Sequence, residues 1–271
     1  MAATTTPRFW RDPQLPFIEM RSIEDGRRVC YSRHAHKVFS IGAITAGRST
    51  YLHEQGQHTV GTGTVVMMNP GAVHACNPID DAPWSYIMMY VDAAWLGGIQ
   101  QACEGREPKG FRPIAALHSR CPALFDGLLA LHAALLDPTL EVLAKHEAAI
   151  GFFMVMQQAL GGAEATAHKP NPRVERAAAY IDAHFTQGIT LEQICRAANL
   201  SEGYLIRAFQ QRYHMTPHAY VVNRRVQHAQ AQLRAGAAIA EIAQQAGFAD
   251  QAHLQRAFKK HLAATPGQYQ R

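Results

Sequence analysis

Three histidines in the first third of the chain have the residue type and spacing of a metal or ligand site. His34 and His36 lie two positions apart, and His74 follows the turn Asn69-Pro70-Gly71. Because residues i and i+2 of a strand face the same side, both imidazoles of the pair can point into one interior. Together with His74 they would form a site with three nitrogen ligands and an open fourth position.

The stretches that carry these histidines resemble the two motifs of the cupin fold, over residues 17–92. In metal-binding cupins a glutamate a few residues after the His-x-His pair completes the site. Here residues 37–41 read Lys-Val-Phe-Ser-Ile, so that carboxylate is missing. We therefore favour contact with a small organic effector over a metal such as zinc, with the metal as the open alternative. The effector-binding candidates are Tyr31, Arg33, His34, His36, His74 and Tyr86, and the metal-binding candidates are His34, His36 and His74.

No other cluster in the sequence indicates catalysis, so we do not expect an enzyme. There is no nucleophile motif, no paired carboxylates and no phosphate-binding loop of the Gly-x-x-x-x-Gly-Lys type. The five cysteines are scattered without a Cys-x-x-Cys pair, which disfavours a disulfide framework and a structural zinc site. The alternative from another class is a metal-dependent cupin enzyme with a helical appendage.

The elements that must position these histidines are short strands. Residues 17–92 contain apolar β-rich runs such as VFSIGAI, GTVVMM and WSYIMMYV, separated by glycine-rich turns. This spacing predicts a small sandwich or barrel. Residues 122–136 and 140–160 instead show apolar positions at helical spacing, which predicts a helical hairpin. The hairpin either covers the barrel or joins two copies of the chain. For the second case the candidates are Leu128, Leu131, Leu135, Phe152 and Met156.

Charge is distributed unevenly along the 271 residues. Residues 169–271 contain 13 Lys and Arg against 6 Asp and Glu, a net charge of +7, whereas residues 1–168 carry a net charge of −2. A basic C-terminal third beside a nearly neutral remainder indicates that this third meets a polyanion. No apolar run approaches the roughly 18 residues of a membrane span, and no signal peptide is recognisable, so we expect a cytoplasmic protein without a membrane partner.

Residues 189–220 and 237–269 repeat one another. Leu205 matches Leu254 and Phe209 matches Phe258, each 49 positions apart. Each copy reads as helix, tight turn and helix, which is how a helix-turn-helix presents its second helix to the major groove of DNA. Arg and Gln read base edges and Lys suits phosphate. The DNA-binding candidates on the exposed faces are Glu202, Gly203, Tyr204, Ile206, Arg207, Gln251, Ala252, His253, Gln255, Arg256 and Lys259.

The run GFADQAHLQRAFKKHLAATPGQYQR at 247–271 resembles the C-terminal signature of the AraC/XylS family of transcription regulators, and residues 191–233 resemble its upstream half. The resemblance implies seven helices over about 173–271, a rigid linker helix near 218–234, and recognition helices near 202–211 and 251–260. The glycine usual before the threonine-proline pair is His214 in the first copy and Ala263 in the second. The strand-rich part is similar to the ligand-sensing domain common in this family.

These observations predict an α+β chain with an N-terminal cupin-like β-barrel and helical hairpin, then an all-α domain with two helix-turn-helix motifs. We expect an irregular arm at 1–16, an effector-binding and dimerisation domain at 17–160, a linker at 161–172 and a DNA-binding domain at 173–271. The expected partners are double-stranded operator DNA, a small-molecule effector, RNA polymerase and a second copy of the chain. Whether DNA binding activates or represses stays open.

Overall fold

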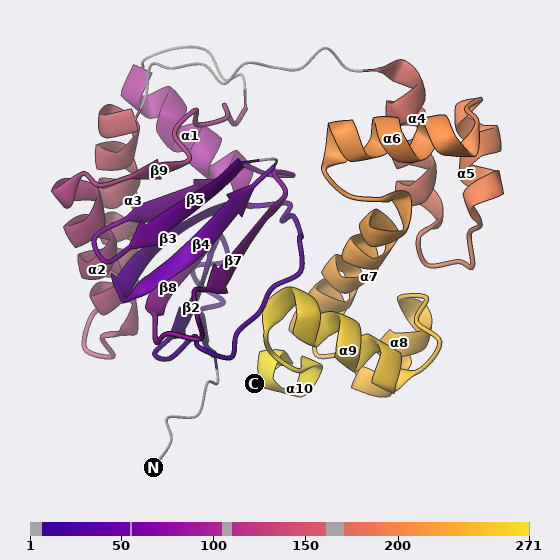
Figure 1. Ribbon diagram of the computed structural model, residues 1–271. Helices are drawn as coiled ribbons and strands as arrows, with labels where there is room; N and C mark the ends of the chain where they lie inside the picture. Colours follow the sequence, from indigo (N-terminus) through magenta and orange to yellow (C-terminus); the bar gives the residue numbers. More distant parts are fainter. Residues whose placement is uncertain (1–6, 55, 105–109, 161–170, 271) are drawn as a thin grey trace.

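The computed structural model describes residues 7–54, 56–104, 110–160 and 171–270. A strand-rich N-terminal part with three helices precedes an all-helical C-terminal part, as the sequence predicted (Figure 1). In the described part of the chain, no helix combines the length and the apolar character needed to cross a membrane.

The strands of the N-terminal part form two antiparallel sheets. A six-stranded sheet has the order β1-β2-β8-β3-β6-β9, and a three-stranded sheet has the order β5-β4-β7. The apolar runs named above become β3, β6 and β8, the central strands of the larger sheet. The strands are β1 Arg8–Arg11, β2 Ile18–Ile23, β3 Phe39–Ala46, β4 Arg48–His53, β5 Gly56–Gly61, β6 Val65–Met68, β7 His74–Pro78, β8 Ser85–Val91 and β9 His118–Ser119.

Two details of the N-terminal part differ from the sequence prediction. In the described residues the two sheets face each other as an open sandwich and do not close into a barrel. The expected irregular arm contains strand β1, whose residues pair with β2 in the register Arg8↔Ser22 to Arg11↔Glu19. Prolines mark the arm as irregular, but Pro7 and Pro13 lie just outside β1, where no ladder hydrogen bond is lost.

Three helices cover the outer face of the larger sheet (Figure 1). They are α1 Ala93–Glu104, α2 Pro122–Leu136 and α3 Val142–Leu160, and the last two form the predicted hairpin. One apolar core lies between these helices and the sheet, and a second lies between the two sheets.

The five residues expected at a dimer joint are at most 6% exposed and belong to the first core. That assignment was wrong, because an apolar stripe facing the chain's own sheet looks the same in sequence as one facing a partner. These residues are Leu128, Leu131, Leu135, Phe152 and Met156.

Seven helices form the described C-terminal part, the number that the family resemblance implies. The helix α7 joins two units, since Val221 packs in the core of the first and Val226 in the core of the second. Asn171 accepts a hydrogen bond from the amide of Arg173 and caps α4, so the domain begins within the predicted linker. Residues 161–170 of that linker lie outside the described residues. The helices are α4 Pro172–His184, α5 Leu191–Ala198, α6 Glu202–Tyr213, α7 Pro217–Arg234, α8 Ile239–Gln245, α9 Gln251–Leu262 and α10 Pro266–Gln270.

Candidate DNA-binding and ligand-binding sites

The first helix-turn-helix consists of α5 and α6. Thr190 and Gln193 form a reciprocal capping box that starts α5, and Asn199 ends it in the left-handed conformation with φ of 52°. Ser201 precedes α6 as predicted, although its side chain makes no capping hydrogen bond in the described structure. Leu205 and Phe209 are fully buried, which fixes the rotation of α6 about its axis.

The second helix-turn-helix consists of α8 and α9 and repeats this design. Gly247 adopts φ of 80° after α8, and Asp250 caps α9 by accepting a hydrogen bond of 2.6 Å from the amide of His253. Leu254 and Phe258 are fully buried, like their counterparts in the first unit. The predicted internal repeat is therefore a repeat of structure, and α6 and α9 are the second helices of the two units, the position that the family resemblance assigns to the recognition helices.

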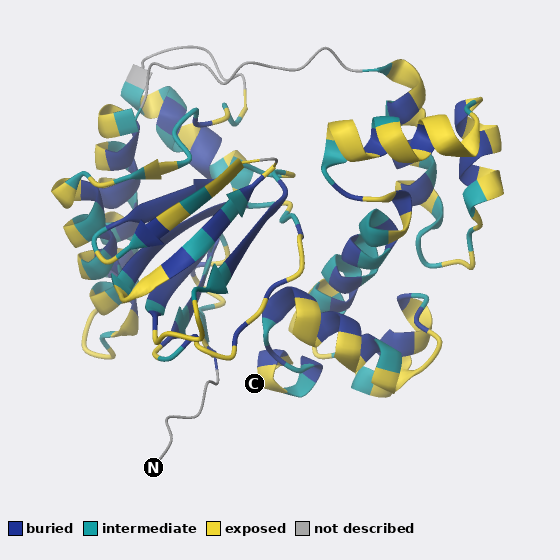
Figure 2. Ribbon diagram, viewed as in Figure 1, coloured by how far each residue is buried: buried dark blue, intermediate teal, exposed yellow. Residues whose placement is uncertain are grey.

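The outward faces of α6 and α9 are exposed (Figure 2). Arg207, Arg256 and Lys259 lie on these faces, and none of the three forms an ion pair within the described structure. By contrast, Arg212 contacts Glu175 at 2.8 Å on the side of α6 nearer to α4. The unpaired cations therefore gather where the helix-turn-helix geometry presents them to DNA.

Apolar groups accompany these cations on α6. Tyr204 is 44% exposed and Ile206 is 36% exposed, values that are unusual for large apolar side chains in this chain. Asn171 donates a hydrogen bond of 3.2 Å to the hydroxyl of Tyr204, which limits where that ring can go. His253 differs from the other candidates, because it is half-buried and its ring packs edge-on against Phe248. The remaining candidates are exposed: Glu202, Gly203, Gln251, Ala252 and Gln255.

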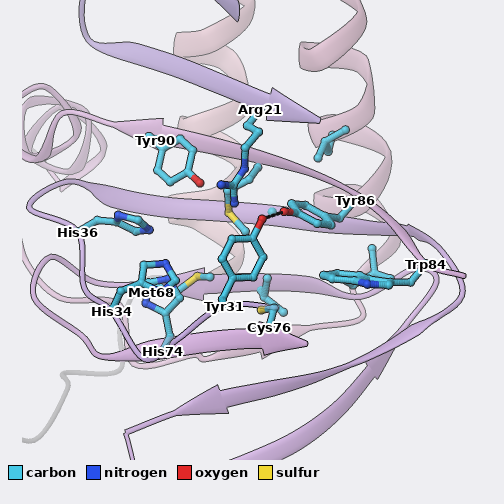
Figure 3. A pocket seen from close by; sticks show the side chains of 15 residues that line it. Arg21, Tyr31, His34, His36, Met68, His74, Cys76, Trp84, Tyr86 and Tyr90 are labelled. Atoms are coloured by element: carbon cyan, nitrogen blue, oxygen red, sulfur yellow. Dashed lines mark hydrogen bonds between the residues drawn. The ribbon is translucent and has the colours of Figure 1, made fainter. Parts of the chain in front are cut away.

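A pocket lies between the two sheets of the N-terminal part (Figure 3). It is lined by all the predicted effector candidates except Arg33, which is exposed and donates to the carbonyl of Glu54. Arg33 was predicted wrongly, because residues 31–38 form no regular strand and the chain bends at Arg33, so strand alternation does not place each side chain. The structure brings together Tyr31, His34, His36, His74 and Tyr86.

The three histidines meet at one end of this pocket (Figure 3). One ring nitrogen of each lies within 4.8 Å of the others, and the ring centroids are 4.5 to 5.0 Å apart. Residue His34 bridges to His74 through backbone hydrogen bonds, which holds the first histidine motif against the second. Burial lowers the pKa of His34 and His36 well below the usual value and that of His74 to about 4, so all three are neutral near pH 7.

The pocket also contains Arg21, which the sequence analysis did not select. Arg21 of β2 is 4% exposed, and its guanidinium lies 5.2 Å from the ring centroid of Tyr31. Figure 3 shows Arg21 and Tyr90 beside the hydrogen-bonded pair of Tyr31 and Tyr86. Arg21 stands in the strand Ile-Glu-Met-Arg-Ser-Ile, where half of the residues are polar, so nothing in the sequence indicates its burial. Cys76 also lines the pocket, and burial raises its pKa to about 12, so it is a thiol and not a thiolate.

The pocket borders the DNA-binding helices. Arg21 extends from the pocket to donate a hydrogen bond of 3.2 Å to the carbonyl of Leu262, the last residue of α9. The backbone amide of Ser32 donates to the carbonyl of Lys260 on the same helix at 2.9 Å. Gln227 of α7 donates to the carbonyl of Ala35 at 2.6 Å. The pocket-lining Arg21 therefore contacts α9 directly, and the segment that carries His34 and His36 contacts both α7 and α9.

Two family models match the chain, one for each part. Residues 20–149 match the model for an AraC-like ligand binding domain, and residues 194–271 match the model for a helix-turn-helix domain. A curated relative, the uncharacterised HTH-type transcriptional regulator YbfI of Bacillus subtilis, is 23% identical over 83% of this chain and 81% of its own length. The HTH-type transcriptional activator RhaS of Klebsiella pneumoniae is 21% identical over 87% of this chain and 86% of its own length.

Solved structures share the arrangement of both parts. An apo variant of ToxT from Vibrio cholerae superposes with a TM-score of 0.59 at 13% identity, covering 93% of this chain and 96% of its own. ToxT bound to an unsaturated fatty acid superposes with a TM-score of 0.55 at 12% identity, covering 98% of this chain and 95% of its own. At 12 to 13% sequence identity, the structural similarity to ToxT shows a shared fold and nothing more.

Proposed function

The chain belongs to the AraC family, as a DNA-binding transcription regulator with an N-terminal ligand-binding domain, and from this premise we propose how it reads and controls its operator. The helices α6 and α9 enter successive major grooves on one face of the duplex, about one helical turn apart. Arg207 and Arg256 read base edges, and Lys259 contacts phosphate.

The observation that carries this proposal is the duplicated helix-turn-helix with unpaired cations on both recognition helices. Other basic residues of the same domain are occupied: Arg224 binds Asp182 through two hydrogen bonds of 2.6 and 2.8 Å. Such pairs hold the first unit to α7, whereas Arg207 and Arg256 make no equivalent contact in the described part of the chain. Free guanidinium groups on a recognition helix are suited to guanine, which they bind through two parallel hydrogen bonds.

A ligand in the pocket between the sheets controls this binding. Its entry changes the side chains that touch α7 and α9, and it shifts the domain arrangement only as far as its affinities for the two arrangements differ. Two chains act together on one operator and recruit RNA polymerase beside it, in the cytoplasm. Support for the pair comes from three exposed leucines near the turn of the α2–α3 hairpin: Leu136, Leu140 and Leu143.

Operator selection from randomised DNA tests the reading residues. We expect Arg207→Ala and Arg256→Ala each to weaken binding to the selected site by about 1 to 3 kcal/mol and to relax base preference at one position. Lys259→Ala should weaken binding to all sequences about equally, because phosphate carries no sequence information.

The matched control for these substitutions is Arg196→Ala. Arg196 is an exposed arginine of α5 that pairs with Glu192 at 2.7 Å, so its loss should leave base preference unchanged. Unchanged base preference in both Arg207→Ala and Arg256→Ala would contradict the assigned reading roles. Failure of the wild-type chain to select any sequence at low salt would contradict the proposed mode of DNA binding as a whole.

A further inference from the structure

The three-histidine cluster has the donor arrangement of a metal site. The Nδ1 atoms of His34 and His74 donate to the carbonyls of Ser32 and Ala72 at 2.8 and 3.0 Å. A carbonyl can only accept, so each Nδ1 carries the proton and each Nε2 keeps its lone pair. Metal-binding histidines almost always donate their second nitrogen in this way, which fixes the ring for coordination.

The size and chemistry of the pocket limit which ligands it can hold. Its free volume is about 20 Å³, room for a single water-sized occupant, so an ion fits without moving the tyrosines or Trp84. No carboxylate of the described residues joins the cluster of His34, His36 and His74. Neutral imidazoles without oxygen ligands suit zinc, cobalt, nickel or copper and disfavour magnesium and calcium.

Two of these histidines lie in the segment that contacts the DNA-binding domain. In residues 32–36, Ser32 donates to Lys260 of α9 through both its amide and its hydroxyl, at 2.9 and 3.1 Å. Ala35, between His34 and His36, accepts from Gln227 of α7 at 2.6 Å. Any ligand that fixes both rings of the pair therefore also fixes the backbone on which α7 and α9 dock.

A fourth histidine comes from the recognition helix itself. His261 of α9 is 8% exposed, and its ring centroid lies 6.3 Å from that of His34. Its Nδ1 contacts the carbonyl of Ala257 at 2.8 Å, so its Nε2 is the nitrogen available to a metal. This separation is larger than the 4.5 to 5.0 Å among the other three rings, so coordination by His261 would require α9 to move closer to the cluster.

We propose that His34, His36 and His74 bind one divalent transition-metal ion, that His261 takes the fourth position, and that the bound ion fastens α9 to the N-terminal domain. The proposal rests on the function proposed above and names the ligand of the pocket. The ion would connect the ligand-binding domain to the helix that carries Arg256 and Lys259, so metal occupancy would restrict the placement of the second helix-turn-helix. Metal would thereby alter operator affinity.

Cobalt titration of the full chain tests the site. The protein is purified without a histidine tag, stripped with a chelator and titrated with Co²⁺, whose visible absorption reports the coordination number. We expect one equivalent of tightly bound cobalt with the intense bands of a four-coordinate site. His36→Gln should lose this binding, while His132→Gln, a half-buried histidine of α2 outside the cluster, should keep it. Near-UV circular dichroism confirms that each variant is folded.

His261→Gln tests the link to DNA. It should retain about one equivalent of cobalt on the remaining three histidines but lose the four-coordinate spectrum. In the wild type, metal should slow amide hydrogen exchange in 251–262 and change operator affinity at least fivefold, within the usual range of coupling between two sites. Both effects should be absent in His261→Gln and present in His228→Gln, a half-buried histidine of α7 that lies outside the cluster and outside the recognition helices.

Three results would overturn the inference. One is a folded wild type that binds no stoichiometric metal, and another is a His36→Gln variant that binds it equally well. The third is a His261→Gln variant with wild-type spectrum, exchange and metal response. A chain that selects its operator while failing these metal tests would leave the proposed DNA binding intact, so the two failures are distinguishable.

Discussion

The residues that end the two recognition helices are in the left-handed conformation, and neither is a glycine. Ala263 follows α9 with φ of 52°, and His214 follows α6 with φ of 51°. These are the positions where the family resemblance expects glycine. A side chain in this region costs about 1 kcal/mol relative to glycine. Ala263→Gly should therefore raise the free energy of unfolding by about that amount, measured by urea denaturation.

An alanine-to-glycine substitution within a helix should have the opposite effect on stability, and it serves as the control. Ala231 is exposed in the last turn of α7, so Ala231→Gly should lower the free energy of unfolding by up to about 1 kcal/mol. An Ala263→Gly variant as unstable as Ala231→Gly would show that the contacts of the Ala263 methyl outweigh the backbone effect.

At the level of single residues, the sequence identified part of the candidate site. The His-x-His spacing and the turn before His74 identified three imidazoles that the fold does bring together. It missed Arg21, which comes from β2 of the same domain, and His261, which comes from α9. The pairing of β2 with β8 places Arg21 in the pocket, and the packing of the two domains places His261 near His34. A spacing rule detects neighbours along the chain, and the contact of His34 with His261, more than 200 residues away, lies outside its reach.

The turn between α8 and α9 joins the two helix-turn-helix units as well as its own helices. Gly247 has φ of 80°, and a Cβ atom there would lie 2.5 Å from the carbonyl oxygen of Thr186, which follows α4. Gly247→Ala thus combines an unfavourable conformation with a backbone clash. We expect a loss of at least about 2 kcal/mol in the free energy of unfolding, together with weaker operator binding.

Gly236→Ala is the comparison for this effect. Gly236 has a similar φ of 82°, but no atom lies within 4 Å of its added Cβ. That variant should lose only the conformational part, about 1 kcal/mol. Equal losses in the two variants, measured by thermal and urea unfolding, would show that Thr186 moves aside without cost.

Elements with a strong local signal were predictable, and those defined by pairing were not. The duplicated pattern of Leu205 and Leu254 located both helix-turn-helix units, because helical spacing and caps are written into neighbouring residues. Strand β1 was missed, since its four residues gain their structure from pairing with β2. The open sandwich replaced the expected barrel for the same reason: closure depends on which strand edges meet, and alternation along one strand carries no information about that.

At the scale of the whole molecule, the N-terminal domain contacts the second helix-turn-helix most closely. Arg11 donates to the carbonyl of Tyr269 in α10 at 2.8 Å, and the hydroxyl of Tyr269 contacts Glu19 of β2 at 3.3 Å. Ser32 and Arg21 contact α9 in addition. The first unit is attached mainly through α7, so a change in the pocket would reposition one recognition helix relative to the sheet domain more directly than the other.

Association of two chains is the last prediction, and it depends on the surface of the hairpin. Leu143 is 67% exposed and Leu136 is 49% exposed near the turn between α2 and α3. Large apolar groups gathered on one surface favour a protein contact. We expect a dimer at tens of micromolar by sedimentation and a monomer for Leu143→Lys. Operator affinity should then fall on the order of 100-fold, because joined units gain avidity without new DNA contacts.

Val155→Lys is the control, since Val155 is 42% exposed but lies roughly 18 Å farther along α3 and on another side of it. A wild-type chain that sediments as a monomer at this concentration, with or without bound metal, would rule out the dimer.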